Sequence, residues 1–468
     1  SPSPAIVFTG SNGIRPYTFT YTVNGGSNQS ITTTSASNSA SLPVSTGTPG
    51  TYTYELVSVK DGSSTECEQL QSGTAVVTVN PLPDANIEGT TQVCRYDPEP
   101  EITFTGSNGI PPYEFTYTIN SGPGYVVVAT SGNSVSLPVP TGSVGSFTYT
   151  LLKVEDSSST TCSQAVGGSA TVTVNPLPAA SISGSTTVCQ DAEPPLITFT
   201  GSNGSTPYTF TYTVNGGSEQ TVSTGSESSS VTVPVLTNTA GTYTYALLSV
   251  EDGSSTACTQ AQTGSATVTV NPLPTASISG TNTVCRNDDP PPVTFTGASS
   301  VAPYTFTYTI NGGPEQSITT VSGNSVSVSA PTATPGTYVY ELVSVLDGSG
   351  TGCEQEQSGS VTITVNPLPV TSSITGNQTP ACEAEGETYS VTLNAGSTYS
   401  WTVPDDATIT SGVNGPDNNT ITVDFGVHNG NVSVVETNSN GCSGNPVNLA
   451  ISLQGCELNA NFSVNNTT

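Results

Sequence analysis

One five-residue string recurs along the chain at the spacing of a whole domain, and it constrains the fold more than any other feature. Val-Asn-Pro-Leu-Pro occurs four times, with its asparagine at Asn80, Asn175, Asn271 and Asn366. A period of about 95 residues is much longer than the 20–50 residues of a solenoid repeat. The chain is therefore expected to contain tandem copies of one small domain, numbered here copy 1 to copy 4.

Each copy reads as a series of short strands. In copy 2 the segments rich in Val, Ile, Thr, Tyr and Phe are 85–94, 102–106, 113–120, 125–130, 134–139, 146–154 and 170–175. Gly, Pro and Asn separate these segments, as is typical of strands joined by turns. About seven antiparallel strands in one domain indicate an immunoglobulin-like sandwich. The predicted class is all-β, with tandem β-sandwich domains arranged as a rod.

Alternation within the strands predicts which side chains are buried. Tyr17, Phe19 and Tyr21 alternate with Thr18 and Thr20. Because successive strand side chains point to opposite faces, the aromatic rings should face the core and the threonines the solvent. The tyrosines of the Gly-Thr-Tyr-Thr-Tyr stretch at 50–54 are likewise expected in the core, and not on a sugar-binding surface.

The repeats predict the domain boundaries. The expected domains are 1–80 (copy 1, without its first strand), 84–175, 179–271, 275–366, a divergent domain at 370–455, and a tail or further domain start at 456–468. The joints contain two prolines each and should be short and stiff. These prolines are Pro81, Pro83, Pro176, Pro178, Pro272, Pro274, Pro367 and Pro369.

Ten cysteines at regular places indicate disulfide bonds and an oxidising, extracellular location. The simplest pairing lies within domains: Cys94–Cys162, Cys189–Cys258, Cys285–Cys353 and Cys382–Cys442. The first and last loops of a regular sandwich lie at opposite ends, which counts against this pairing. Pairing between domains, such as Cys94 with Cys258, therefore stays open.

Cys67 and Cys456 have no partner in the within-domain scheme and are expected to be unpaired or intermolecular. One interpretation is that the sequence is a segment cut from a longer chain. The alternative is a filament subunit that polymerises by donor-strand exchange, in which the tail of one subunit supplies the first strand missing from the next. In that case Cys456 would bond to Cys67.

Charge and composition exclude several functions. The net charge of −29 disfavours binding to nucleic acid or anionic membranes. No apolar run is long enough to span a membrane. A single histidine, His428, and the absence of catalytic motifs predict that the chain is not an enzyme and holds no cofactor. The one candidate ion is Ca²⁺, at acids in equivalent loops: Asp97, Glu99, Glu101, Asp191, Glu193, Asp288 and Asp289.

Two stretches carry a family resemblance. Residues 109–117, Gly-x-x-Pro-Tyr-x-Phe-x-Tyr in outline, and residues 241–258 resemble gliding-motility adhesin repeats of the SprB type in Bacteroidetes. Residues 370–455 resemble a PKD-like domain through Tyr-Ser-Trp-Thr-Val-Pro, Ile-Thr-Val-Asp-Phe-Gly and Asn-Gly-Cys. The resemblance implies type IX secretion, a place on the bacterial cell surface, and a role in adhesion or gliding. It implies no catalytic residues.

The predicted function is a non-catalytic stalk or filament segment of a bacterial cell-surface adhesin. Its partners would be neighbouring domains or copies of the same surface protein. The alternatives are the polymerising filament subunit and a polysaccharide- or ice-binding module of a secreted protein. A binding module would carry an exposed row of aromatic side chains, or a flat ladder of threonines, on the same face of each copy.

Overall fold

The structure is a computed structural model that describes residues 3–413 and 415–456. Within these residues the regular secondary structure is all strand, and no helix is long and apolar enough to cross a membrane. The chain divides into two compact units. The first contains Ser1–Ser183, Ile197–Val233 and Thr244–Ala266, and the second contains Gly184–Leu196, Pro234–Tyr243 and Thr267–Thr468.

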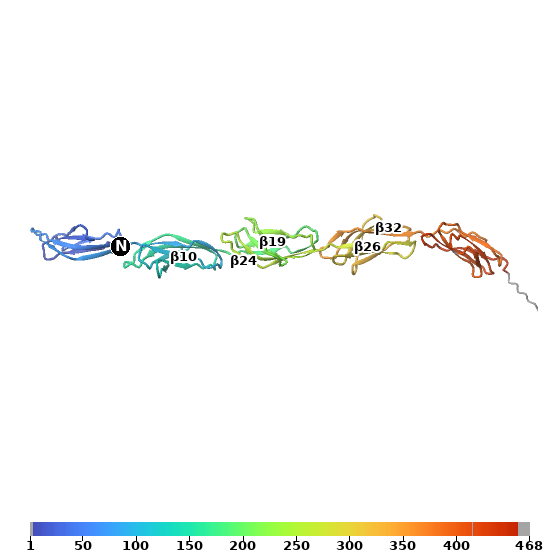
Figure 1. Ribbon diagram of the computed structural model, residues 1–468, viewed down its shortest axis with the longest axis horizontal. Coiled ribbons are helices and arrows are strands. Elements are labelled where there is room, and N and C mark those ends of the chain that lie inside the picture. Colours follow the sequence, from blue (N-terminus) through green and yellow to red (C-terminus); the bar gives the residue numbers. More distant parts are fainter. Residues whose placement is uncertain (1–2, 414, 457–468) are drawn as a thin grey trace, which may run out of the picture. The chain divides into compact units, whose positions relative to one another are not determined.

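Copy 2 lies wholly in the first unit and shows the repeat fold most completely. Its strands are β8 (Asp84–Glu88), β9 (Thr91–Cys94), β10 (Glu101–Ser107), β11 (Glu114–Ile119), β12 (Gly124–Val128), β13 (Ser134–Pro138), β14 (Gly145–Glu155), β15 (Ser163–Ala165) and β16 (Ser169–Asn175). Three of them form one sheet in the order β13-β10-β8. The other sheet has the order β12-β11-β14-β16-β9, with β15 paired to β14. In Figure 1 the ribbon of copy 2, which carries the label β10, is built of strands.

The core of copy 2 fills the space between these two sheets. Ile102, Phe104, Phe115, Val154 and Val172 have no exposed surface. The rings of Phe104 and Phe115 stack at 5.7 Å, so that β10 of one sheet meets β11 of the other. Alternating burial along both strands confirms the two-faced pattern predicted from the sequence. The predicted all-β sandwich class is confirmed.

One predicted strand is two strands. Segment 85–94 was expected to be a single antiparallel strand, but it divides at Gly89 into β8 and β9. β8 pairs antiparallel with β10, whereas β9 crosses to the other sheet and pairs parallel with β16. Gly89 has φ +116°, and a Cβ on it would lie 2.3 Å from the Glu101 carbonyl oxygen. Only glycine fits this crossing between sheets.

Copy 1 has the same plan without its opening strands. Its strands are β1 (Ala5–Thr9), β2 (Thr18–Val23), β3 (Gln29–Thr32), β4 (Ser39–Pro43), β5 (Gly50–Lys60), β6 (Glu68–Leu70) and β7 (Thr74–Val79). Among the described residues β1 pairs with β4 alone, and β7 pairs with β5 alone. Tyr17, Phe19, Tyr21 and Tyr54 are buried, as predicted.

Copy 3 repeats these elements: β17 (Ala179–Ser183), β18 (Thr186–Cys189), β19 (Leu196–Ser202), β20 (Thr209–Val214), β21 (Gln220–Ser223), β22 (Ser230–Pro234), β23 (Gly241–Glu251), β24 (Thr259–Ala261) and β25 (Ser265–Asn271). The division between the two units falls within this copy. In the first unit β17 pairs with β19 and β20 pairs with β21. In the second unit β18 pairs parallel with the end of β25.

Copy 4 lies wholly in the second unit. Its strands are β26 (Thr275–Ser279), β27 (Asn282–Cys285), β28 (Pro292–Ala298), β29 (Thr305–Ile310), β30 (Gln316–Thr319), β31 (Ser325–Ser329), β32 (Gly336–Leu346), β33 (Glu354–Glu356) and β34 (Ser360–Asn366). The sheet orders, β26-β28-β31 and β27-β34-β32-β29-β30, match those of copy 2. The aligned sequence pattern therefore produces the same pairing in both units.

The divergent domain after copy 4 also has two sheets. Its strands are β35 (Glu387–Ser390), β36 (Thr398–Thr402), β37 (Thr408–Ser411), β38 (Gly415–Pro416), β39 (Thr420–Asp424), β40 (Gly430–Thr437) and β41 (Val447–Ile451). Trp401 lies on β36, is 3% exposed and donates Nε1–H to the Asn418 carbonyl at 3.0 Å. Trp401 therefore belongs to the core of this domain. The tail beyond Cys456 lies outside the described residues.

Candidate functional site: disulfide clamps between successive copies

A loop with the pattern Asp-x-Ser-x-Thr-x-Cys follows the long strand of every copy, and we call it the clamp loop. The four clamp loops are 61–67, 156–162, 252–258 and 347–353. In copy 3, Asp252 Oδ1 accepts hydrogen bonds from Ser254 Oγ (2.6 Å) and from the Cys258 amide (3.0 Å). The Asp252 amide donates in turn to the Cys258 carbonyl at 3.0 Å. This ring of bonds fixes the direction of the cysteine.

In copies 2 and 4 the clamp loop favours the ionised form of its aspartate. In copy 4, burial opposes the ionisation of Asp347, but hydrogen bonds from Ser300, Ser349 and the Cys353 amide outweigh it and lower the pKa of Asp347. In copy 2 the pKa of Asp156 is lowered as well, since bonds from Ser158 and the Ile110 and Cys162 amides outweigh its burial. A carboxylate that accepts several hydrogen bonds favours the charged form.

Disulfides join the clamp loops of copies 3 and 4 to the copy that precedes each of them. Cys94, at the end of β9 in copy 2, bonds to Cys258 in copy 3, with Cα atoms 5.6 Å apart. Cys189, at the end of β18, bonds to Cys353 in copy 4, at 5.5 Å. Each bond closes a loop of 164 residues and spans one joint between copies.

The asparagine of the repeated Val-Asn-Pro-Leu-Pro string supports the same joint. Asn175 Nδ2 donates to Thr256 Oγ1 at 3.0 Å, and Thr256 Oγ1 lies 3.2 Å from Cys258 Sγ. Asn271 makes the same bond to Thr351 at 2.9 Å, and Asn80 to Thr160 at 3.0 Å. One end of each copy thus contacts the clamp loop of the next through a polar bond beside the disulfide position.

The joint to the divergent domain uses a related loop. Cys285 of copy 4 bonds to Cys442, with Cα atoms 5.5 Å apart. Here Asn438 replaces the aspartate: its Oδ1 accepts from the Cys442 amide at 3.0 Å, and its Nδ2 donates to the Pro367 carbonyl at 2.9 Å. Cys382 bonds to Cys456, and it closes a loop of 74 residues.

The predicted within-domain pairings Cys94–Cys162, Cys189–Cys258, Cys285–Cys353 and Cys382–Cys442 are wrong. Cys94 lies opposite Asn175, at the end of the copy that adjoins the next one. Cys162 lies in the clamp loop that Asn80 contacts, at the end that adjoins the preceding copy. The two cysteines of a copy are therefore at opposite ends, and the alternative Cys94–Cys258 pairing is the one found.

Two further cysteine predictions change. Cys456 was expected to be unpaired or intermolecular, but it bonds to Cys382, so the proposed bond between Cys456 and Cys67 is not formed. Cys162 was expected in a disulfide, but it is free and half-buried. Cys67 is free and exposed. Both free thiols lie in clamp loops with the same aspartate bonds as the disulfide-bonded ones.

The predicted calcium ligands are not brought together. Asp97 and Asp288 use their Oδ2 atoms to accept from the amides of Cys94 and Cys285, both at 2.8 Å, and so act as turn caps. Glu101 lies on β10, and Asp191 has its amide bonded to the Thr237 carbonyl. Within residues 3–413 and 415–456, no group of three or more His, Cys, Asp or Glu side chains could hold a metal ion. Glu99, Glu193 and Asp289 belong to the same loops.

The exposed aromatic residues do not form a repeated row. Tyr96 and Tyr125 are exposed in copy 2. Their equivalents in copy 3 are Asp191 and Gln220. The outward threonines instead bond across strands: Thr103 Oγ1 lies 2.9 Å from Ser136 Oγ, and Thr294 Oγ1 lies 2.8 Å from Ser327 Oγ. His428 is exposed, and its Nδ1 lies 2.8 Å from Asp406 Oδ2.

Comparisons with known proteins identify one segment. Residues 367–451 match the PKD-like domain family, which confirms the resemblance of that domain. No curated protein matches the chain. The similar solved structures include a Ca²⁺-stabilised adhesin with which an Antarctic bacterium binds ice (16% identity, 79% of this chain and 99% of that one, TM-score 0.37). Others are a tetra-tandem repeat from the extending region of a large adhesion protein (18%, 77% and 95%, 0.26) and a variant of three titin immunoglobulin domains (14%, 62% and 99%, 0.37). Values this low identify neither a family nor a function for the whole chain.

Proposed function

We propose that this chain is a non-catalytic stalk segment of a bacterial cell-surface adhesin, and that its clamps stiffen the joints between copies. The observation that carries the proposal is the position of the disulfides. Three of them join consecutive domains. A disulfide that stabilised only one domain would instead lie within that domain. These disulfides restrain the position of each domain relative to the next one along the chain.

Each joint that carries a disulfide has two covalent connections and one polar contact. Between copies 2 and 3 these are the Asn-Pro-Leu-Pro linker after β16, the Cys94–Cys258 bond, and the hydrogen bond from Asn175 to Thr256. Pro178 in this linker is buried, so the linker itself packs against the protein. A joint held at two points resists bending and twisting far more than a single flexible linker. This suits a spacer that must hold a binding part away from a cell.

The location and pathway in the proposal rest on chemistry and resemblance. Disulfides persist outside the cytosol, which supports an extracellular place for the chain. The sequence resemblance to gliding-motility adhesin repeats supports a bacteroidete surface protein, exported by type IX secretion and active in adhesion or gliding. Neighbouring domains of the same surface protein would be the partners, and no bound cofactor is part of the proposal.

Protease shaving of intact cells tests this function. Antibodies against copy 3 should label unpermeabilised cells of the source bacterium, and added protease should remove the signal. Cells lacking the protein should lose surface attachment or gliding. Strains with Cys94→Ser and Cys258→Ser together should keep the protein on the surface but attach less firmly under flow. Signal confined to the cytosol, or attachment unchanged in the deletion strain, would contradict the proposal.

A further inference from the structure

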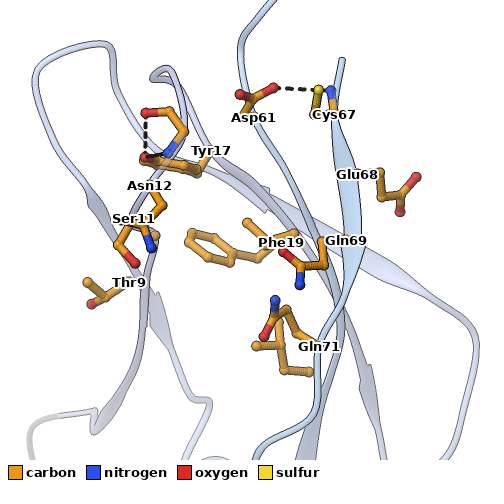
Figure 2. A pocket seen from close by; sticks show the side chains of 14 residues that line it. Thr9, Ser11, Asn12, Tyr17, Phe19, Asp61, Cys67, Glu68, Gln69 and Gln71 are labelled. Atoms are coloured by element: carbon orange, nitrogen blue, oxygen red, sulfur yellow. Dashed lines mark hydrogen bonds between the residues drawn. The ribbon is translucent and has the colours of Figure 1, made fainter. Parts of the chain in front are cut away.

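Copy 1 has an open groove where the other copies have a strand. The groove has a volume of about 630 Å³ and is lined by residues on or next to β1, β2, β5 and β6, including Thr9, Phe19, Val59, Gln69 and Gln71. Figure 2 shows Phe19 between the strand that carries Thr9 and the strand that carries Gln69. An aromatic side chain of the core thus forms the floor of an opening on the surface.

The equivalent space in the other copies is filled by the opening strand. A Cβ placed on Gly168 of copy 2 would lie 3.1 Å from Cγ2 of Ile87 on β8. Gly264 and Ile182 of copy 3 repeat this contact at 3.3 Å, as do Gly359 and Ile278 of copy 4. The equivalent glycine in copy 1 is Gly73, and a Cβ on it would meet nothing within 4 Å.

The side chains under the groove are less buried than their equivalents. Leu151, Val154 and Val172 of copy 2 are 1%, 0% and 0% exposed. Their equivalents in copy 1, Leu56, Val59 and Val77, are only half-buried. The backbone edges are open as well: within the part of the chain that the structure describes, β1 and β7 each lack the partner that β10 finds in β8 and β16 finds in β9. Such an edge is a template for one more strand.

The free cysteine of copy 2 is a second, independent observation. The opening segments of copies 2, 3 and 4 share the pattern Ala-x-Ile-x-Gly-x-x-x-Val-Cys, at 85–94, 180–189 and 276–285. In each case the final cysteine bonds to the following domain, in its clamp loop or, for Cys285, in the related loop that carries Cys442. Cys162 is the clamp cysteine that follows copy 1, and Asn80 already contacts its loop through Thr160 at 3.0 Å. A segment that filled the groove would therefore place its cysteine beside Cys162.

We propose that the groove of copy 1 and the thiol of Cys162 together form a binding site for an extended segment of the pattern Ala-x-Ile-x-Gly-x-x-x-Val-Cys. The segment's first strand pairs antiparallel with the free edge of β1, and its isoleucine packs between Phe8 and Gly73. The glycine turns the segment across to the other sheet. Its second strand pairs parallel with β7, and its cysteine forms a disulfide with Cys162. The register is that of β8 with β10 and of β9 with β16.

The tail of the chain is a poorer occupant of this site. Residues 459–468, which lie outside the described residues, contain Ala460 and Phe462 at the right spacing. Val464 stands where the pattern requires glycine. A second copy of the chain could therefore offer a first strand but not the glycine turn that crosses to the other sheet. The site selects a segment that carries both the glycine and the cysteine.

A synthetic peptide with the sequence of residues 84–95 tests the proposal. It is supplied as a mixed disulfide with glutathione, so that no oxidant is needed. The Cys162 thiol loses its proton to solvent, its sulfur attacks the peptide sulfur, and glutathione leaves as a thiolate that takes up a proton. Because docking raises the local thiol concentration into the millimolar range, micromolar peptide should label Cys162 about 100-fold faster than Cys67.

Matched variants separate docking from chance labelling. Gly73→Trp fills the groove where a side chain meets open space, and it should reduce labelling of Cys162 to the rate of Cys67. A peptide with aspartate in place of its isoleucine should lose the same preference without any change to the protein. Cys162→Ser should remove the adduct but keep reversible binding of the peptide.

Three results would overturn the proposal. The first is equal labelling of Cys67 and Cys162. The second is preferential labelling of Cys162 that is reduced neither by Gly73→Trp nor by the aspartate peptide. The third is self-association of the unlabelled chain that a peptide of residues 459–468 abolishes. The last result would assign the groove to a second copy. None of these results depends on where the protein acts. The stalk function is tested separately, by the experiments on intact cells.

Discussion

A single aspartate organises each clamp loop at the scale of the residue. Asp347 Oδ1 accepts from Ser349 Oγ at 2.6 Å and from the Cys353 amide at 2.9 Å, and Ser300 Oγ donates to its Oδ2. Cys353 has no exposed surface, so its bond to Cys189 forms in a position that the loop has already fixed. The carboxylate therefore links the local turn to the joint between copies 3 and 4.

We expect Asp347→Asn to loosen the clamp loop of copy 4 at neutral pH. Hydrogen bonds to charged groups contribute about 1.5–3 kcal/mol, so the Cys353 amide should exchange about 10- to 100-fold faster with solvent. The folded-state pKa of Asp347 lies below its ordinary value of 3.8. Its contribution is thus complete above the ordinary value and is lost as the pH falls through the lowered pKa.

Hydrogen-exchange mass spectrometry of the clamp-loop peptide measures this effect. The difference between variant and parent should be large at pH 7 and should shrink below about pH 4, where the unfolded aspartate becomes protonated. Asp289→Asn, at an exposed site, serves as the control and should leave the loop unchanged. Equal exchange in Asp347→Asn and the parent at pH 7 would show that the carboxylate does not hold the loop.

At the scale of the element, the sequence predicts strands well and their pairing less well. Alternation of Phe104 and Ile102 with threonines predicts β10 and its buried face, because period-two burial is a local property. The crossing at Gly89 is not local: it depends on a carbonyl of β10 that lies close only after folding. The glycine at this position in copies 2, 3 and 4 was the available signal.

The disulfide pairing of the clamp is likewise not a local property of the sequence. The cysteines and their spacing are visible in the sequence, but the pairing depends on which ends of consecutive copies adjoin. The first and last loops of a sandwich lie at opposite ends, and this favours the pairing between domains that the structure shows over the pairing within domains. The groove of copy 1 could be predicted only in part: the missing first strand was recognised, but the paired role of Cys162 required the observed disulfides.

We expect Cys258→Ser to release the thiol of Cys94 and no other. Cys94 bonds to Cys258, and the two Cα atoms lie 5.6 Å apart. Alkylation of the denatured, unreduced variant, followed by peptide mass spectrometry, should therefore find free thiols at Cys67, Cys94 and Cys162. The parent protein is the control and should show only Cys67 and Cys162. A free thiol at Cys189 instead would restore the within-domain pairing.

At the scale of the whole molecule, the disulfides create a short covalent route through the chain. From copy 2 the route runs to Cys94 and crosses to Cys258. It continues along the chain to Cys285 and crosses to Cys442 in the divergent domain. Most of copies 2, 3 and 4 lies in segments that this route bypasses. The bond between Cys189 and Cys353 joins the two bypassed segments and does not shorten the route.

This connectivity predicts how the chain extends when it is pulled by its ends. The bypassed segments span 164 and 157 residues, which at about 3.3–3.6 Å per residue hold roughly 1,100 Å of chain. Single-molecule force spectroscopy should find the fully unfolded, oxidised chain shorter than the reduced chain by that length. Cys94→Ser should lengthen the oxidised chain, whereas the double variant Cys189→Ser and Cys353→Ser should not, because that bond lies off the route. An oxidised chain as long as the reduced one would show that the clamps carry no tension, and a stalk built on them would lose its mechanical basis.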